Sequence, residues 1–567
     1  MTETRQNPRW LPILSVAAFL ALAGLFMHGP ERVLSLARGV VRAEPSFREL
    51  PAAAGWSLLR MTASYLLSLA VAWTAGYWAA TSARAARIIL PLLDVGQSVP
   101  VLGFFPAAIY VFINVLGGGR VSLELAAIFL IFTSQAWNLA FGVYEGLTTI
   151  PAETRAAVDS LGVRGLLRLR ALLFPACVPT LLYNSILSWA NGWYFLIACE
   201  IIVAGPVQYD LPGLGATLSR AIALGDLRLA AAALATLITV VLVLEFLVWR
   251  PLREWSRRYR YDTQAAAEDE TASFLLPDLG LPALLRPLRA AAHAVWSHVP
   301  LAAVNRRLEA AGLVARRAWR LLGWPLLAAM AVVLVLAVSA TVRVLMPPWP
   351  REVASLPLAL LFSFLRIGAA YLLALLWIVP VALWASDHPR GMRWLSVVAQ
   401  VGASIPATGF FPVLVALLVN RFGGMEIISV ALALTGMQWY LLFNLLSGVQ
   451  RVPHDLRESL RSLGLSSGQI HRRLVLPACM PSLVTGSVVA WGGTWNALIL
   501  SEYVVYRGHV FQVLGVGALL NRATFGTGSR SLLFLSLAAL VITVVTFNRL
   551  VWDRLYRFVQ DRYRLEG

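Results

Sequence analysis

The stretch VPHDLRESLRSLGLSSGQIHRRLVLPACMP, from Val452 to Pro481, decides how the chain is interpreted, because a related stretch precedes it. From Ile150 to Pro179 the sequence reads IPAETRAAVDSLGVRGLLRLRALLFPACVP. At a constant offset of 302 residues, the two stretches share the pairs Pro151/Pro453, Arg155/Arg457, Ser160/Ser462, Leu161/Leu463, Gly162/Gly464, Pro175/Pro477, Ala176/Ala478, Cys177/Cys479 and Pro179/Pro481. Chance does not produce this series, so we infer an internal duplication.

The composition places the chain in a membrane. It has 567 residues, of which 59% are hydrophobic and 13% charged, with a mean hydropathy of +0.71. This is too apolar for a soluble protein of ordinary composition. Because about twenty apolar residues span a bilayer as a helix, we predict an all-α, polytopic protein with twelve spans. The predicted spans are 10–27, 56–80, 92–116, 121–143, 178–203 and 229–249 in the first half, and 324–345, 356–384, 395–419, 425–446, 482–503 and 531–552 in the second.

The placement of arginine predicts the orientation. The formal charge is +18 and the chain has no lysine, so every positively charged side chain apart from histidine is arginine. Most arginines fall on one side if both termini are cytoplasmic, as the positive-inside tendency requires. Arg32, Arg38, Arg42 and Arg48 fall on the other side and weaken this assignment. The basic charge therefore indicates orientation rather than nucleic-acid binding, and both copies of the duplicated stretch face the cytoplasm.

The lack of lysine also excludes several activities. A phosphate-binding loop of the GxxxxGK[ST] type and a Schiff-base enzyme both need a lysine. The sequence has no HExxH motif and no zinc-type cluster of Cys and His, and its three cysteines do not form a secreted disulfide framework. We therefore expect no cofactor on this chain and no enzyme activity, so any nucleotide must be hydrolysed by another subunit.

The duplication covers both halves of the chain. At an offset of 306, SVPVLGFFP from Ser98 to Pro106 matches SIPATGFFP from Ser404 to Pro412, and later pairs such as Trp137/Trp439 keep the offset of 302. Because each half has six predicted spans, both enter the membrane in the same direction, and such a parallel repeat encloses a path on its axis. The predicted units are a first repeat at 1–249, a cytoplasmic linker at 250–323, a second repeat at 324–552 and a cytoplasmic tail at 553–567.

The linker is charged and has no span. Its pieces Leu281 to Trp296 and Ala302 to Arg320 are amphipathic and rich in arginine, as expected of helices on an anionic leaflet. A solvated tether between the halves fits the same residues.

The second copy of the duplicated stretch predicts a short docking helix. Leu456, Leu460 and Leu463 follow a helical spacing that places them on one face. Gly464 ends the helix where a left-handed residue is wanted, and Ser466 with Gln469 forms a capping box for the next helix. A capped helix with one apolar stripe suits a groove on a partner. The alternative is an ordinary loop helix that packs on its own transmembrane bundle. The presence of a second copy in register favours the docking helix over this alternative.

At this point the sequence resembles a known family. The segments AAVDSLG…LFP and ESLRSLG…VLP are similar to the EAA loop of ABC-importer permeases, whose glycine and proline fall here at Gly162 and Pro175 and at Gly464 and Pro477. LLRMTASYLLSLAVAW and the VPVLGFFP region resemble the nitrate/sulfonate/taurine branch. One position departs from the family pattern, because Glu458 fills the glutamate position in the second copy and Ala156 fills it in the first.

The resemblance implies a type I ABC importer in a bacterial inner membrane, with two permease units fused in one chain. It implies two copies of an ATPase subunit bound to the two stretches and an extracytoplasmic binding protein that delivers a small, anionic solute. It assigns coupling roles to Glu153, Arg155, Asp159, Leu161, Gly162, Asp455, Arg457, Glu458, Leu463 and Gly464. One alternative is a secondary transporter, which also has repeated halves but needs no duplicated docking helix. A second alternative is a membrane-embedded enzyme, for which the sequence offers no set of catalytic residues.

Several residues are candidates for the substrate path. Arg60 and Arg366 lie in predicted spans and could attract an anion, could pair with Glu200 and Glu502, or could extend to lipid headgroups. The other candidates are aromatic: Trp189, Trp491, Phe104 and Phe410, with Trp193 and Trp495 beside them. Tryptophan is also common in packing and at membrane interfaces. Glu245 has no acidic counterpart, since the offset of 302 pairs it with Phe547.

Overall fold

The computed structural model describes the two halves and leaves out most of the segment between them. The described residues are 46–98, 100–102, 108, 112, 120–163, 165–204, 207–259, 339, 342–343, 346–418, 424–506, 509–523, 527 and 529–563. Within them the chain is largely helical, as predicted, with two small hairpins.

The first half is a series of long helices joined by short elements. Its elements are η2 (Phe47–Glu49), α3 (Leu50–Thr81), α4 (Ala83–Ser98), α6 (Arg120–Thr148), α7 (Ala152–Ser160), α8 (Gly165–Arg168), η3 (Leu169–Leu173), α9 (Phe174–Glu200), β1 (Ile201–Ala204), β2 (Val207–Asp210), α10 (Leu214–Ala223), α11 (Leu227–Leu244), η4 (Glu245–Trp249) and α12 (Arg250–Arg257). Contacts between α3 and α6 and between α6 and α9 build the bundle of this half.

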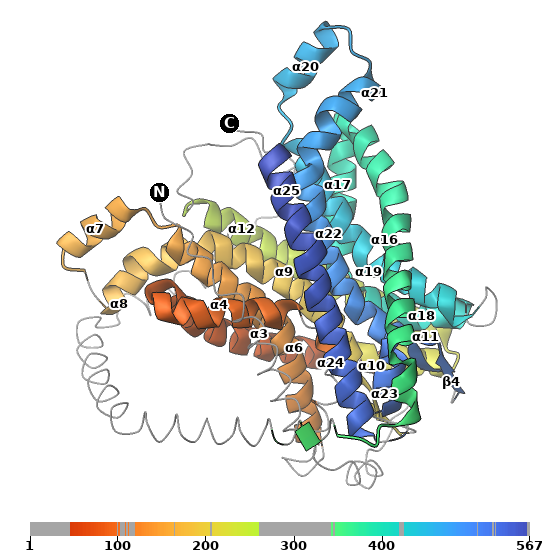
Figure 1. The fold of residues 1–567 in the computed structure, drawn as a ribbon. Coiled ribbons are helices and arrows are strands. Elements are labelled where there is room, and N and C mark those ends of the chain that lie inside the picture. The colour runs from red at the N-terminus through yellow and green to blue at the C-terminus, as the bar shows by residue number, and fades with distance from the viewer. Residues whose placement is uncertain are drawn as a thin grey trace.

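The second half repeats this order. Its elements are η6 (Arg351–Ser355), α16 (Leu356–Asp387), α17 (Pro389–Ser404), α18 (Ala407–Leu418), α19 (Met425–Gln450), α20 (His454–Ser462), α21 (Ser467–Ile470), η7 (His471–Val475), α22 (Leu476–Ser501), β3 (Tyr503–Tyr506), β4 (His509–Gln512), α23 (Val516–Asn521), α24 (Arg530–Phe547), η9 (Asn548–Trp552) and α25 (Asp553–Tyr563). The first-half helices run across Figure 1 and those of the second half run up it, so α7 and α20 lie at separate corners of the molecule.

Eight helices within the described residues are long and apolar enough to cross a membrane. They are Phe47–Thr81, Val121–Thr148, Leu169–Glu200, Leu227–Ser256, Arg351–Asp387, Met425–Gln450, Ser467–Ser501 and Arg530–Tyr563. They confirm eight of the twelve predicted spans. The predicted span 10–27 lies outside the described residues, and so does nearly all of 324–345.

Two predicted spans differ from the structure. The segment 395–419 is not one helix, because α17 ends at Ser404 and α18 begins at Ala407. Pro406 explains the break, since the residue before a proline is disfavoured in the helical conformation. The 16 residues of α17 and the 12 of α18 are each short for a bilayer. In the first half α4 ends at Ser98, and most of the remainder of 92–116 lies outside the described residues.

The ends of other elements also differ from prediction. The helices predicted at 178–203 and 482–503 stop at Glu200 and Ser501, and each chain then forms an antiparallel hairpin, β1–β2 or β3–β4. Short β-branched and aromatic runs suit such strands. The predicted unit boundaries at 249 and 552 fall inside continuous helices, because α12 extends α11 and η4, and α25 extends α24 and η9.

Four π-helical turns in the described residues interrupt the spans at matching places. η3 and η7 keep the offset of 302, whereas η4 and η9 are related by 303. Trp249 therefore corresponds to Trp552, and each of these rings packs edge-on against Trp189 or Trp491. This shift corrects the predicted register, because Glu245 corresponds to Asn548 rather than to Phe547. It still has no acidic counterpart.

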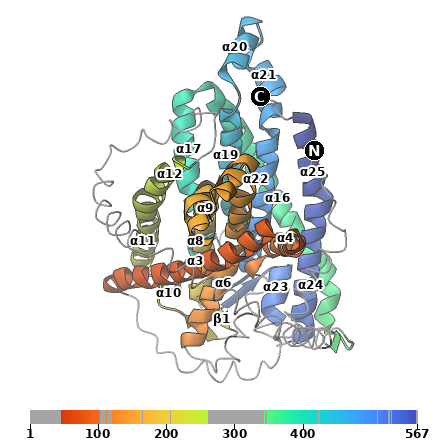
Figure 2. The same cartoon turned by 90° about the vertical axis from the view of Figure 1, so that its left-hand side faces the viewer.

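The helix α18 is one of the elements through which the two halves meet. This helix packs against α9 and α10 of the first half. A Cβ atom added to Gly409 would lie 3.2 Å from Cδ2 of Leu237, so the helices approach closely there. In Figures 1 and 2, α20 lies at one end of the second half and α23 at the other.

Candidate functional site

The duplicated stretches form two short helices outside the candidate spans, α7 and α20. Each ends on a glycine in the left-handed conformation, Gly162 with φ +66° and Gly464 with φ +81°. The backbone N–H of Gly464 donates to the carbonyl of Arg461 at 2.9 Å, and that of Leu465 donates to Leu460 at 3.1 Å. The equivalent bonds close α7. Both helices therefore end in the Schellman motif, and the left-handed conformation predicted for Gly464 is confirmed.

The apolar stripe on these helices is divided between the chain and solvent. Leu463 is 75% exposed and its counterpart Leu161 is 78% exposed, although both are large apolar residues outside the spans. Leu456 is also exposed, whereas Leu460 and its counterpart Val158 are partly buried against the chain's own core. Each helix thus turns one apolar residue toward its bundle and presents a leucine beside the terminal glycine.

The predicted charged residues on these helices have different environments. Glu153, Asp455 and Glu458 are exposed, and so is Ala156, which occupies the glutamate position in α7. Asp159 forms an ion pair with Arg168 at 3.0 Å. The capping box predicted at Ser466 is present, and its backbone N–H donates to Oε1 of Gln469 at 2.9 Å.

The two matched arginines bind the chain's own backbone. Nη2 of Arg457 donates to the carbonyl of Val449 at 2.7 Å, and Nη1 donates to the carbonyl of Ser386 at 2.8 Å. Arg155 donates in the same way to the carbonyl of Leu147. Burial lowers the pKa of Arg457, yet a guanidinium remains a cation in proteins. These arginines tie each helix to the end of the preceding span, and their contact with a partner protein stays a prediction.

A further cluster fixes only the second of these helices. Asp387, the last residue of α16, pairs with Arg461 at 3.2 Å and with His471 at 2.9 Å. The corresponding first-half residues are Thr81, Asp159 and Leu169, which cannot form this cluster. Among the described residues, no group of three or more His, Cys, Asp or Glu side chains could hold a metal ion.

Arg60, a predicted path residue, lies in a buried cluster of charges. Its Nε and Nη2 donate to Oε2 and Oε1 of Glu124 at 2.5 and 2.9 Å, and its Nη1 donates to Oε1 of Glu200 at 2.7 Å. Ser57 donates to the same Glu200 oxygen at 2.6 Å, and Nη2 of Arg60 also donates to the carbonyl of Pro212 at 2.8 Å.

The second half repeats this cluster. Arg366 donates to the two oxygens of Glu426 at 2.6 and 2.8 Å and to Glu502 at 2.8 Å. Ser363 donates to Glu502 at 2.6 Å, and Arg366 also donates to the carbonyl of Leu514 at 3.0 Å. The pairing of both arginines with Glu200 and Glu502 is confirmed. A role in the substrate path stays a prediction, and in this structure each guanidinium is occupied by two carboxylates of its own half.

Sequence reasoning missed one carboxylate in each cluster. Glu124 and Glu426 are separated by 302 residues, as Glu200 and Glu502 are, so the duplication itself carried the signal. Ser57 and Ser363 follow the earlier offset of 306. An identical polar residue at matching places in two apolar halves could have identified all of these positions.

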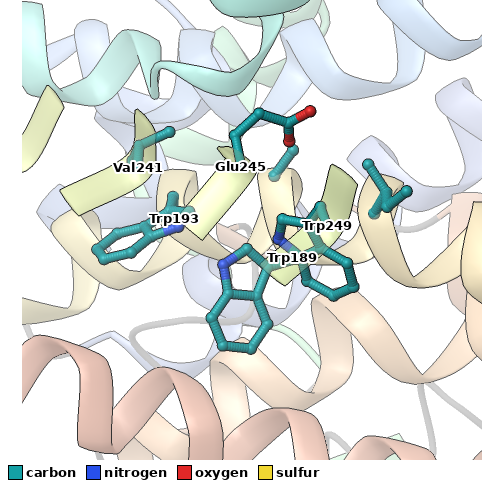
Figure 3. Close-up of a pocket in the computed structure, with 7 residues that line it drawn as sticks. Trp189, Trp193, Val241, Glu245 and Trp249 are labelled. Carbon is teal, nitrogen blue, oxygen red and sulfur yellow. The ribbon is translucent and has the colours of Figure 1, made fainter. Parts of the chain in front are cut away.

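The tryptophans predicted for the path lie in aromatic clusters. Trp189 packs edge-on against Tyr65 with 5.4 Å between ring centroids, and Trp491 packs against Tyr371 at 5.6 Å. Trp189 also lines a cavity of about 20 Å³, together with Ile186, Ala190, Trp193, Val241, Glu245 and Trp249. Figure 3 shows the three indoles in a row below Glu245. A cavity of this size holds a water molecule rather than a solute.

The remaining path candidates are the two phenylalanines. Phe410 lies on α18, the helix between the halves, and is partly buried. Phe104 lies outside the described residues.

Comparison with known proteins agrees with this arrangement. The profile of the family described as binding-protein-dependent transport system inner membrane component matches residues 72–250 and 378–565, together more than half of the chain. A putative ABC transporter permease protein of Methanocaldococcus jannaschii is 26% identical over 228 residues, which cover 40% of this chain and 80% of that protein. This coverage fits a chain that holds the family unit twice.

Two further relatives have names that include a solute. The nitrate import permease of Leptolyngbya laminosa is 24% identical over 36% of this chain and 68% of its own length. The taurine transport system permease of Escherichia coli K12 is 26% identical over 28% of this chain and 56% of its own length. Two matches to one profile, in two halves with the same order of elements, give the conclusion that this chain belongs to the inner-membrane components of binding-protein-dependent transport systems, as a duplicated permease.

Proposed function

We propose that this chain is the complete membrane permease of an ATP-driven importer and that separate ATPase subunits dock on α7 and α20. One observation carries the proposal. Outside the spans, both halves present a corresponding short helix, ended by a left-handed glycine beside a largely exposed leucine. A single exposed apolar residue is ordinary on a protein surface, but the same leucine beside the same left-handed glycine in both halves supports a repeated docking site.

Two docking helices at separate corners of the molecule suit two copies of the ATPase (Figure 1). In this proposal, ATP binding and hydrolysis change how the two ATPases lie against each other. The docked helices follow this movement and shift the permease between two global states, one open to each side of the membrane. Both helices and both termini then face the cytoplasm.

The names of the relatives support a small anion as the solute. Nitrate and taurine are the solutes named for two of them, and both carry a compact, oxygen-rich anionic group. The family name includes a binding protein. We therefore propose that an extracytoplasmic binding protein delivers the anion to the face opposite α7 and α20.

The test is ATP hydrolysis by the complex purified gently from native membranes through a tag on this chain. The wild-type eluate is expected to contain an ATPase and vanadate-sensitive hydrolysis. Gly162→Val with Gly464→Val should remove both, because φ near +70° is strained for a β-branched residue. A Cβ atom would meet nothing within 4 Å at either glycine, so the effect is on backbone conformation alone.

The matched control is Gly468→Val. Gly468 belongs to the next helix, lacks the positive φ and also faces open space. Its replacement should leave hydrolysis and binding near the wild-type values. Full hydrolysis in the double glycine variant would refute the docking assignment. An intact complex without any ATPase would favour a secondary transporter instead.

A further inference from the structure

The two buried charge clusters perform the same task at the start of a short helix. α10 begins after Gly213 and α23 after Gly515, and neither glycine supplies a side-chain cap. The first N–H groups of a helix have no partner within it. Here Gly215 donates to Oε2 of Glu200 at 2.7 Å and Leu214 donates to Ser57 at 3.0 Å. A glutamate from the end of α9 and a serine 157 residues before Leu214 therefore cap α10.

The second half has the same arrangement. Gly517 donates to Oε2 of Glu502 at 2.7 Å, and Val516 donates to Ser363 at 3.0 Å. Each capping glutamate thus accepts bonds from a serine, an arginine and a backbone N–H. All three groups are hydrogen-bond donors, and they bind different oxygens of the carboxylate, so both oxygens must be acceptors. An amide of the same size has only one acceptor and cannot replace the carboxylate.

Glu200 and Glu502 lie at the far ends of the two long helices that begin just after α7 and α20. α8, η3 and α9 form one continuous helix from Gly165 to Glu200, and α21, η7 and α22 form another from Ser467 to Ser501, next to Glu502. At 1.5 Å per residue, each is about 50 Å long. In Figure 1, α7 lies at the outer edge of the first half and α10 lies toward the second half.

The capped helix α10 reaches the other half of the molecule. It packs against α18, which also binds the first half through the hydrogen bond from Thr408 to the carbonyl of Tyr194. A continuous series of contacts therefore leads from α7 along α9 to Glu200, then to α10 and to the second half. Both α9 and α10 contact α18, and the carboxylate of Glu200 is the point at which α9 holds α10.

We propose that Glu200 and Glu502 are positioning residues for transport, which make each long helix and its capped short helix move as one body. This inference rests on the proposed function, because it needs an ATPase acting at α7 and α20. It assigns the carboxylates no contact with the solute. While Glu200 holds α10, a displacement at α7 moves α10 together with α9, and both helices act on α18. Without the carboxylate, only the direct contact of α9 with α18 remains. In the second half Glu502 joins α22 in the same way to α23, which packs on α16 and α24.

The experiment compares wild type with Glu200→Gln/Glu502→Gln in the full complex, reconstituted in vesicles with its ATPase and binding protein. Solute uptake and ATP hydrolysis are measured in the same sample. The glutamines keep the size but turn a donor toward Gly215 and Gly517, so both caps are lost. We expect hydrolysis within about twofold of wild type and about tenfold less solute per ATP, as the loss of a charge-assisted hydrogen bond implies.

The ratio of uptake to hydrolysis separates positioning from mere folding. A variant that folds poorly lowers both rates in proportion, and that result would overturn the inference, as would an unchanged ratio. Glu49→Gln is the control, because Glu49 is exposed, lies eight residues before Ser57 and takes no part in the cluster. It should behave as wild type. Absence of hydrolysis in the wild-type complex would instead refute the proposed function and this inference with it.

Discussion

Thr408 of the second half and Tyr194 of the first are joined by a hydrogen bond of 3.0 Å, from the threonine Oγ1 to the tyrosine carbonyl. The corresponding positions in the repeat are Leu102 and Asn496, and they are joined as well. The backbone N–H of Leu102 donates to Oδ1 of Asn496 at 3.0 Å. The two halves therefore exchange equivalent contacts, as the subunits of a two-fold dimer do. Fusion has kept the symmetry of a dimer within one chain.

Loss of the Leu102–Asn496 hydrogen bond should lower the stability of the protein more than loss of the Thr408–Tyr194 hydrogen bond. Asn496→Leu keeps the size but leaves the buried N–H of Leu102 without an acceptor, at a cost of about 1–3 kcal/mol. Thr408→Val removes only a side-chain donor and should cost about 1 kcal/mol or less. Thermal unfolding of the purified chain in one detergent would rank the two variants. A larger loss for Thr408→Val would contradict this account of the interface.

The two charge clusters predict that replacing Arg60 and replacing Arg366 destabilise the protein by different amounts. Arg60→Gln leaves Glu200 and Glu124 facing each other with no cation, and Glu124 is only 19% exposed. Breaking such a buried set costs about 3–5 kcal/mol. Arg366→Gln should cost less, because Glu426 is 58% exposed and can turn toward solvent.

The thermal midpoints of these two variants test the difference. Arg351→Gln, an exposed arginine before α16, serves as the control and should leave the midpoint unchanged. Equal losses for Arg60→Gln and Arg366→Gln would show that exposure of the second carboxylate has no influence.

Gly213 is required by the close approach of Glu200. A Cβ atom at this position would lie 2.2 Å from the carboxyl carbon, and that carboxylate is held by Ser57, Arg60 and Gly215. Gly213→Ala should therefore destabilise the protein clearly. Gly368→Ala is the matched control, because Gly368 lies within α16 with nothing within 4 Å. Alanine there should stabilise the helix by about 0.5–1 kcal/mol. Opposite signs in a thermal shift are expected, and a shift of the same sign would contradict the argument.

Arg457 should control how tightly α20 is held. Its two hydrogen bonds to backbone carbonyls are part-buried, so Arg457→Gln should speed amide hydrogen exchange in residues 454–462 by about tenfold or more. Arg461→Gln removes an exposed ion pair with Asp387 and should change exchange by less than about threefold. Similar exchange in the two variants would show that Arg457 does not anchor the helix.

The local features of the chain were predictable because local sequence decides them. The length of an apolar run predicts a membrane span, and the constant offset between matching residues predicts that the chain consists of two corresponding halves. Gly162 and Gly464 ended their helices as expected, since a left-handed residue favours glycine wherever it lies. The prediction of one span at 395–419 was wrong although the cause of the break is local, because Pro406 interrupts a run that is otherwise apolar.

The sequence by itself determined a duplicated membrane protein with two capped helices outside the spans, because hydropathy, repeat register and glycine conformation are properties of short segments. Only the tertiary structure decided which groups meet. Arg60 is bound by Glu124 and Glu200, which lie 64 and 140 residues away in the chain. Arg60 meets these two carboxylates because α3, α6 and α9 pack side by side. A charged group buried away from water must be paired with an opposite charge or a hydrogen-bond partner. The packing of the helices decides which residue that partner is.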